Sequence, residues 1–245
     1  MKIAVCFAGF LRSFPVTISN WNFRLNKIDC DVFIHSPNTY YAPLEENQYD
    51  SKEPHIVDPN FITSSFRDKL KGLHLYSYDS NIFKEIINKH SIPPNNHIGQ
   101  YSYRVISYQY NIQETVKMVI SSGTHYDYIM ITRGDLNLYT DFDFSNINND
   151  IINYPLYHGL SFQGEPKLGV AGVFGTSYAF NDQIFIGNFD KVSVLKNIYD
   201  CIPSYNQEGI IINSETLLGF HYLKHNIFFG TNDFIKYDIL RFAKQ

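Results

Sequence analysis

The chain has 245 residues with a net charge of −4, and 18% of its residues are charged. Its length is enough for one large α/β domain, or for one domain with a small additional lobe. An acidic balance without a polybasic stripe argues against binding to nucleic acid, which depends on neutralising phosphates with Lys and Arg.

The N-terminal segment and the cysteines favour a cytoplasmic protein. Residues 1–10 contain an apolar run that is too short to span a membrane and lacks the length and cleavage site of a signal peptide. Cys6, Cys30 and Cys201 are far apart and form no CxxC motif. This argues against a disulfide framework or a zinc knuckle and favours a reducing compartment. We therefore expect a cytoplasmic protein without a transmembrane segment.

The first predicted strand is Ile3–Phe7, and residues 8–15 leave it as a loop. Small residues at the carboxyl end of a strand allow a ligand to approach the backbone. Arg12 in this loop either donates two hydrogen bonds to a phosphate or forms a surface ion pair. The chain carries neither GxGxxG nor GxxxxGK[ST], so it lacks the common phosphate-binding loops.

Two further strands are predicted at residues 31–35 and 73–76. The former should end beside the carboxyl end of the first strand. Residues 38–60 have weak periodicity and are interpreted as a long loop that either covers the site or is disordered. The predicted order of these elements is strand, strand, strand and then a helix that is capped by Asp79 or Ser80.

A long helix is predicted over residues 101–121, directly before the central strand. Arg104 in its first half lies either on a solvated face or beside the cleft formed by the strand ends. The run Tyr128–Thr132 that follows is short, uncharged and partly β-branched. It therefore suits an inner strand that is covered on both faces.

Polar residues follow this central strand directly. Gly134 allows the backbone to turn or to approach a ligand. Asp135 and Asn137 are two positions apart, so in an extended chain their side chains project to the same side. Such oxygen ligands suit Mg²⁺ or Mn²⁺, and Arg133 adds a positive charge beside them. The alternative interpretation is a strand that ends in a solvated turn.

The second half contains fewer clear patterns. The Asp-x-Asp at residues 141–143 follows a polar turn rather than a strand, so we prefer Asp135 as the metal ligand. Residues 159–175 are rich in glycine. The run Ile184–Ile186 predicts a strand, and Asp182 before it either orients an acceptor hydroxyl or belongs to a turn.

Two helices and a last strand complete the prediction, at residues 190–200, 214–226 and 227–229. Glu215 lies in the first turn of the second helix, where the helix dipole favours a carboxylate. His221 and His225 have the spacing of a zinc pair, but without an HExxH motif we interpret them as ordinary helix residues.

Four blocks taken together resemble a group of small GT-A type glycosyltransferases, which occur in bacterial surface-polysaccharide clusters and in large DNA viruses such as chlorella viruses. The blocks are residues 4–14, 126–136, 181–187 and 214–218, in the order expected for the group. The resemblance implies an α/β, GT-A-like fold over residues 1–245, with a Rossmann-like, mostly parallel central sheet flanked by helices. It further implies a nucleotide-binding half, residues 1–140, and an acceptor-side half, residues 141–245. For a viral protein, the compartment would be the host cytoplasm.

The resemblance also implies a UDP- or GDP-sugar donor, a glycan or other hydroxyl acceptor, and a divalent metal, Mn²⁺ or Mg²⁺, held by a DxD-like motif. Asp135 and Asn137 would take the position of that motif, although an amide binds a divalent ion more weakly than a second carboxylate. The residues assigned to the nucleotide are Ala8, Gly9, Phe10, Arg12, His35, Arg104 and Arg133.

The implied reaction has plain chemical requirements. Breaking the sugar–phosphate bond leaves negative charge on the diphosphate, which a metal plus Arg12 or Arg133 would stabilise. In an inverting reaction a carboxylate must also deprotonate the acceptor hydroxyl, and Asp182 and Glu215 are the candidates. The spacing of these residues does not distinguish inversion from retention.

Two other functions are compatible with the sequence. One is a non-catalytic nucleotide-binding or glycan-binding module that shares the fold but has lost the second acid of the metal motif. The other is a nucleotidyltransferase, which usually has a glycine-rich, basic loop near its N-terminus. The corresponding loop here contains Gly9 and Arg12, which is a weak match.

Overall fold

The computed structural model describes residues 1–40, 56–95, 101–155 and 180–240. The glycine-rich stretch at 159–175 and residues 41–55 of the predicted long loop lie outside this part of the chain. The strands are β1 (Ile3–Ala8), β2 (Cys30–Pro37), β3 (Leu70–Tyr76), β4 (Tyr128–Thr132), β5 (Leu136–Leu138), β6 (Ile151–Tyr154), β7 (Ile184–Asn188), β8 (Phe228–Thr231) and β9 (Tyr237–Ile239). The helices are α1 (Phe14–Leu25), α2 (Pro59–Phe66), α3 (Ser80–Lys89), α4 (Ser102–Ser121), α5 (Phe189–Ser193), α6 (Ile198–Gln207) and α7 (Ser214–Lys224).

Seven strands form one mixed sheet in the order β3-β2-β1-β4-β7-β6-β8. Strands β1 to β4 are parallel, β7 runs antiparallel to β4 and β6, and β8 is parallel to β6. Within this sheet β7 alone therefore runs against the other strands. The predicted α/β class with a mostly parallel central sheet is confirmed, and the arrangement is compatible with a Rossmann-like fold.

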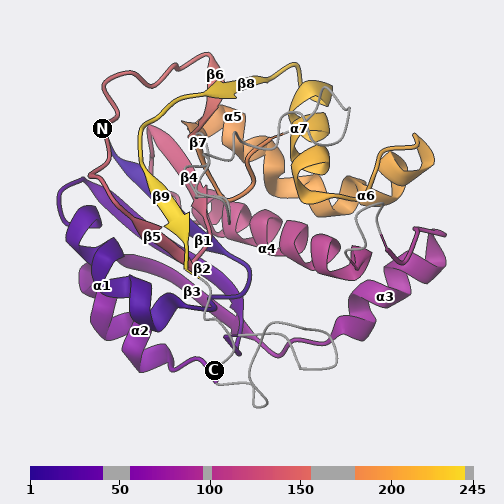
Figure 1. The fold of residues 1–245 in the computed structure, drawn as a ribbon, viewed down its shortest axis with the longest axis horizontal. Helices are drawn as coiled ribbons and strands as arrows, with labels where there is room; N and C mark the ends of the chain where they lie inside the picture. The colour runs from indigo at the N-terminus through magenta and orange to yellow at the C-terminus, as the bar shows by residue number, and fades with distance from the viewer. Residues whose placement is uncertain (41–55, 96–100, 156–179, 241–245) are drawn as a thin grey trace, which may run out of the picture.

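The sheet is covered on both faces (Figure 1). Side chains alternate along β1, so that Ile3, Val5 and Phe7 pack on one face with α1 and α2, and Ala4 and Cys6 pack on the other face with α4. All six residues of β1 are buried, as expected for an inner strand between two helical layers.

Helix α1 corrects the predicted order of three strands followed by a helix. It begins with Pro15 in its first turn, where the missing N–H costs nothing. Its buried side chains include Phe14, Ile18, Trp21 and Leu25, an apolar stripe at helical spacing that the prediction overlooked. Helix α2, between β2 and β3, was also missed: its first two residues were included in the predicted loop, and no element was predicted for the rest.

The second half differs from the prediction in two places. The helix predicted over residues 190–200 is interrupted, because α5 and α6 are joined by a 3₁₀ turn at Val194–Asn197. The strand predicted at residues 227–229 is present as β8 but is not the last one. Strand β9 follows it and pairs with β5 in a separate two-stranded sheet.

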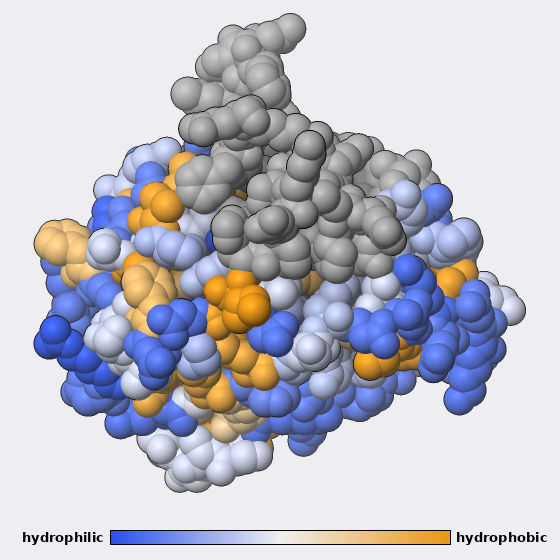
Figure 2. Space-filling model, turned by 90° about the horizontal axis from the view of Figure 1, so that it is seen from below, coloured by the Kyte–Doolittle hydropathy of each residue, from blue (hydrophilic) through white to orange (hydrophobic). Residues whose placement is uncertain are grey.

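The surface is mixed in character. On the face shown in Figure 2, hydrophobic side chains are interspersed with hydrophilic ones. The described helices include none that is long and apolar enough to cross a membrane.

Candidate functional site

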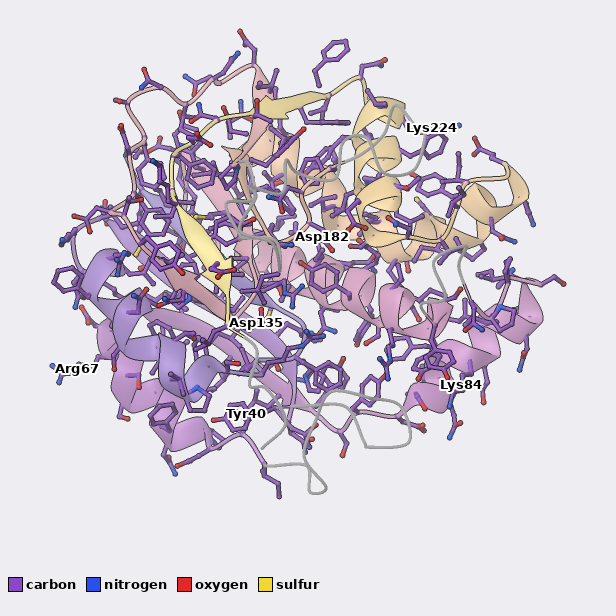
Figure 3. The ribbon with its side chains drawn as sticks, viewed as in Figure 1. Tyr40, Arg67, Lys84, Asp135, Asp182 and Lys224 are labelled. Carbon is purple, nitrogen blue, oxygen red and sulfur yellow. The ribbon has the colours of Figure 1, made fainter. Side chains whose placement is uncertain are left out.

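The site lies where the antiparallel strand β7 begins beside the end of β4. Because Thr132 at the end of β4 pairs with Ile184 at the start of β7, the residues after β4 and before β7 meet at the carboxyl edge of the sheet. The backbone N–H of Arg133 donates to the carbonyl of Gln183 at 3.2 Å. The two segments that the sequence singled out, around residues 133–135 and around Asp182, are therefore neighbours. Figure 3 shows Asp135 and Asp182 near the centre of the molecule.

Helix α4 covers this edge with Tyr108. The Tyr108 hydroxyl donates to the backbone carbonyl of Asp182 at 2.6 Å. Its ring also lies over the loop after β1, since a Cβ at Gly9 would meet the Tyr108 ring at 3.1 Å. Gly9 has a φ of 87°, a conformation that favours glycine. Tyr108 lies in the helix predicted over residues 101–121, but it was not among the predicted site residues.

Helix α7 brings its N-terminus to Asp182. Asn213 caps the helix by accepting from the N–H of Thr216 at 3.1 Å. The next residue, Ser214, hydrogen-bonds to the carboxylate of Asp182 and accepts from Gln109 of α4 at 2.9 Å. Glu215 follows directly. The structure thus brings together Asp182 and Glu215, the two carboxylates that the sequence assigned to acid–base chemistry.

The structure pairs Asp135 with Arg133. Arg133 donates from Nε to Oδ1 of Asp135 at 2.9 Å and from Nη2 to Oδ2 at 2.6 Å, which is the bidentate geometry of a strong guanidinium–carboxylate pair. The Asp135 side chain is 1% exposed. Burial opposes the charge of Arg133, but Asp135 outweighs it and holds the pKa of the guanidinium above its ordinary value.

Arg12 approaches the same carboxylate from the loop after β1. Its Nη1 lies 3.5 Å from Oδ2 of Asp135, and its side chain is 39% exposed. Arg12 has a φ of 44°, which is strained for a residue with a side chain. Its backbone N–H donates to the carbonyl of Tyr40 at 2.9 Å, which helps to hold this conformation.

The pKa values of the two acids, Asp182 and Glu215, are both raised. Burial, assisted by the nearby charge of Asp182, raises the pKa of Glu215 to about 8. Burial also raises the pKa of Asp182, assisted by Asp135 and opposed by Arg133 and Ser214. Asp182 and Glu215 are half-buried as whole residues, and burial of their carboxyl groups is the largest cause of both shifts in pKa. A pair of this kind holds a proton near neutral pH.

Tyr108 is surrounded by these charges. Burial raises its pKa well above the ordinary value, assisted by Asp182, Asp135 and Glu215 and opposed by Arg133. Its phenol is therefore neutral and serves as a hydrogen-bond donor in the site. A tyrosine at helical spacing gives no sequence signal for this role, because the same spacing is expected of a core residue.

The other predicted residues are placed less centrally. His35 at the end of β2 bonds through Nδ1 to Asn111 at 2.9 Å, and burial lowers its pKa to about 4, so its ring is neutral. Phe10 packs on Tyr78, with ring centroids 4.9 Å apart. Ala8 is buried at the end of β1.

Arg104 and Asn137 also have defined places. The Arg104 guanidinium lies over the ring of Tyr101 at 5.4 Å, one helical turn before Tyr108. Asn137 lies on β5, half-buried and opposite Asp238 of β9.

The segment around β9 lies outside the main sheet and forms hydrogen bonds with residues of the site. The Tyr237 hydroxyl donates to Oε1 of Gln183 at 2.9 Å and accepts from Nδ2 of Asn181 at 2.8 Å. It therefore holds both neighbours of Asp182. The N–H of Leu240 donates to the carbonyl of Asp135 at 2.8 Å. We name residues 237–240 the clamp segment.

The arrangement at Asp135 does not fit a divalent ion. Mg²⁺ and Mn²⁺ need carboxylate lone pairs, and the guanidinium of Arg133 occupies both oxygens of Asp135. Among the described residues, no group of three or more His, Cys, Asp or Glu side chains is placed to hold a metal. Metal dependence stays a prediction from the resemblance, and this pairing counts against Asp135 as the ligand.

The remaining metal-like patterns have local partners. Asp141 pairs with Lys27 at 2.7 Å, and Asp143 accepts from the backbone N–H of Ser145 at 2.9 Å. His221 is fully buried and bonds to the Tyr205 hydroxyl at 2.7 Å. These contacts agree with the interpretation of both patterns as structural.

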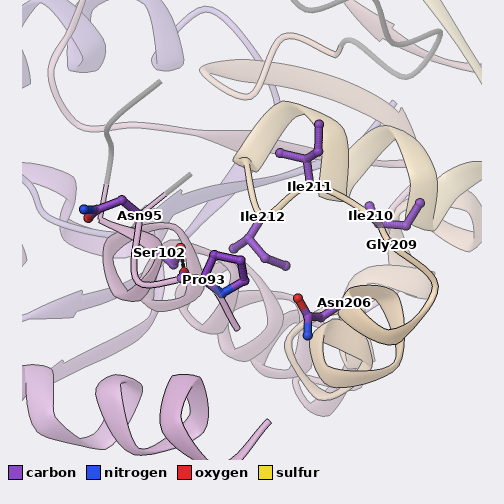
Figure 4. Close-up of a pocket in the computed structure, with 8 residues that line it drawn as sticks. All are labelled: Pro93, Asn95, Ser102, Asn206, Gly209, Ile210, Ile211 and Ile212. Carbon is purple, nitrogen blue, oxygen red and sulfur yellow. Dashed lines mark hydrogen bonds between the residues drawn. The ribbon is translucent and has the colours of Figure 1, made fainter. Parts of the chain in front are cut away.

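A separate cavity of about 360 Å³ lies between the segments that precede α4 and α7 (Figure 4). Its lining consists of Pro93, Asn95, Ser102, Asn206, Gly209, Ile210, Ile211 and Ile212. None of these side chains is titratable, so this cavity offers no acid–base group of its own.

In comparisons with known proteins, no family model matches this chain and no curated protein matches it significantly.

Proposed function

We propose that this protein is a glycosyltransferase that moves a sugar from a nucleotide-sugar donor to a hydroxyl acceptor. The observation that carries the proposal is the pair of carboxyl groups with raised pKa, Asp182 and Glu215, placed beside Arg133 at the carboxyl edge of a mostly parallel sheet. Ligands of open α/β folds bind at this edge. The GT-A resemblance and the nucleotide assignment of residues 1–140 belong to the same proposal.

In the proposed reaction, the sugar moves from the diphosphate of the donor to the hydroxyl of the acceptor. The bond between the anomeric carbon and the diphosphate oxygen breaks, and the electron pair leaves with that oxygen. The acceptor oxygen forms the new bond to the anomeric carbon, and its proton passes to the Asp182–Glu215 pair. Such a base works best when its pKa is close to the working pH, and it accelerates a reaction by roughly 10²–10⁴-fold.

Arg133 and Arg12 supply positive charge where the diphosphate gains negative charge. Fixed guanidinium groups stabilise a developing anion because their orientation is set before the reaction begins. Asp135 contributes by holding the guanidinium of Arg133, and Tyr108 contributes a neutral donor close to Asp182.

The test is release of the nucleoside diphosphate from a panel of UDP-, GDP- and CDP-sugars, with simple sugars and water as acceptors. We expect one base to be preferred, and release to fall by about 100-fold or more in Asp182→Asn, the lower range for loss of a general base. If the folded protein binds nucleotides but consumes none of the sugar nucleotides, the non-catalytic binding module replaces this proposal. Incorporation of the nucleotidyl group into a product would instead indicate a nucleotidyltransferase.

A further inference from the structure

The carboxylate of Asp135 accepts hydrogen bonds from two arginines. Both of its oxygens accept hydrogen bonds from Arg133, at 2.9 and 2.6 Å, and Arg12 lies 3.5 Å from the second oxygen. A divalent ion at this carboxylate would have to share its oxygens with two guanidinium groups or displace Arg133. Displacement would leave a buried guanidinium without its partner, which is strongly unfavourable.

The two guanidinium groups beside Asp135 also disfavour a cation there. Arg12 and Arg133 place two positive charges at Asp135, and Asp182, which also interacts with Arg133, lies nearby. A second cation at this position is repelled by two guanidinium groups, whereas an anion with several oxygens is attracted to them. Guanidinium groups also match the geometry of phosphate oxygens, to which they donate in pairs.

The backbone of Arg12 has an unusual conformation in this position. Its φ of 44° is strained for a residue with a side chain, and the surrounding structure must offset that strain. The loops after β1 and β4 pack tightly here, since a Cβ at Gly134 would lie 3.0 Å from the carbonyl of Leu11. A strained arginine, held by its backbone beside a buried ion pair and still 39% exposed, is placed to meet a ligand.

We infer that the site binds a diphosphate through Arg12 and Arg133, with Asp135 as the anchor of Arg133 instead of a metal ligand. The inference deepens the proposed function, and it rests on that function for the nucleotide and sugar attached to the diphosphate. Binding of the diphosphate itself rests on the two arginines. It is therefore independent of a divalent ion.

The experiment is titration calorimetry with inorganic pyrophosphate, UDP and GDP. The protein and ligands are passed over a chelating resin, because a soluble chelator is itself an anion, and the titrations are repeated with added Mn²⁺. We expect binding of pyrophosphate and of one nucleotide in the metal-free samples, with affinities that Mn²⁺ changes by less than about threefold. Binding that requires Mn²⁺, or no binding in either condition, would overturn the inference.

Two variants sharpen the test. Arg12→Ala should weaken pyrophosphate binding by about tenfold or more, the usual effect of losing charged hydrogen bonds. Arg67→Ala is the matched control, because Arg67 is also an arginine with positive φ, 51°, but lies at the periphery of the molecule (Figure 3). An equal loss in both variants would contradict a specific role of Arg12.

Asp135→Asn separates the two interpretations of that residue. As a metal ligand, Asp135 would be needed for binding, and the variant would lose it. As an anchor, Asp135 is needed only to hold Arg133; Asn keeps one acceptor for the guanidinium and turns the other oxygen into an NH₂ donor, so metal-free pyrophosphate binding weakens but persists. Metal-free binding of pyrophosphate and nucleotide without consumption of any sugar nucleotide would support this inference while refuting the proposed transfer reaction.

Discussion

The two ends of the central sheet hold carboxylates in opposite circumstances. At the amino end, Asp31 accepts from Nζ of Lys2 at 2.9 Å and from the hydroxyl of Tyr126 at 2.8 Å. At the carboxyl end, Asp135 takes both donors of Arg133, and the nearby Asp182 and Glu215 are left with raised pKa values. The amino end uses its charges for stability, whereas the carboxyl end keeps an acid pair in an unfavourable state. Such unfavourable states are typical of functional sites.

Breaking the best-satisfied pair at the carboxyl end should have the largest effect. Asp135→Ala leaves Arg133 buried without its partner and should lower the free energy of unfolding by about 3–5 kcal/mol. Chemical denaturation measures this. The matched control is Asp141→Ala, which removes an exposed partner of Lys27 and should cost less than about 1 kcal/mol. Similar losses in the two variants would contradict the role given to the buried pair.

Replacing Asp by Asn should lower the rate of transfer at the carboxyl end of the sheet, but lower stability at the amino end. Asp182→Asn should lower the rate of transfer by about 100-fold or more, because the acceptor's proton loses its base, while the protein stays folded. Asp31→Asn should leave the rate unchanged and lower stability by about 1–3 kcal/mol, because charged hydrogen bonds to Lys2 and Tyr126 are weakened. Rate assays and denaturation on both variants test the comparison. A loss of rate in Asp31→Asn would refute it.

The acid pair also predicts how stability depends on pH. Glu215 has an ordinary pKa of 4.5 and a pKa of about 8 in the folded protein, so the folded state binds its proton more tightly than the unfolded state. This contribution to the free energy of unfolding is complete below about 4.5 and decreases as the pH rises to about 8. In Glu215→Gln this decrease should disappear, and the melting temperature at pH 8 should exceed that of the unmodified protein. Parallel pH dependences would contradict the raised pKa.

The clamp segment should show the smallest effect. Tyr237→Phe removes the hydroxyl that holds Asn181 and Gln183 but keeps the ring in the core. We expect kcat to fall by about fivefold to tenfold with little change in KM, the size expected for one neutral hydrogen bond. The kcat–pH profile should also shift, because Asp182 lies between the two residues that the hydroxyl fixes. A loss of stability without a change in kcat or in its pH profile would reduce Tyr237 to a structural residue.

Elements with a strong local pattern were predictable from the sequence. Strand β4 was found from its uncharged run, and α3 from the Asp79 cap, which accepts from the N–H of Asn81. Helix α1 was missed although Phe14, Ile18, Trp21 and Leu25 mark it, because Pro15 was taken as part of a loop. Proline is compatible with the first turn of a helix, so this error was avoidable.

The sequence named Asp182 and Glu215 but not Tyr108 or Tyr237, and it did not show how these residues are connected. Asp182 and Glu215 were identified from their positions next to predicted elements, and the antiparallel direction of β7 is what brings Asp182 to the edge. The direction of a strand is not encoded in its own pattern, since pairing partners decide it. The pairing of Asp135 with Arg133 was equally hidden, because residues two apart usually face the same side only in an extended chain, and these two lie in a turn.

The clamp segment has a consequence for the order of events during synthesis. The seven strands of the main sheet are all contained in residues 3–231, whereas Tyr237 and Leu240 emerge from the ribosome later. Domains generally fold as units during synthesis. A chain that stops at residue 236 contains the seven strands of the main sheet and both carboxylates, but it lacks the Tyr237 hydroxyl that holds both neighbours of Asp182 and the Leu240 N–H that donates to the carbonyl of Asp135. Such a truncated chain should lose more activity than Tyr237→Phe, even where its main sheet forms.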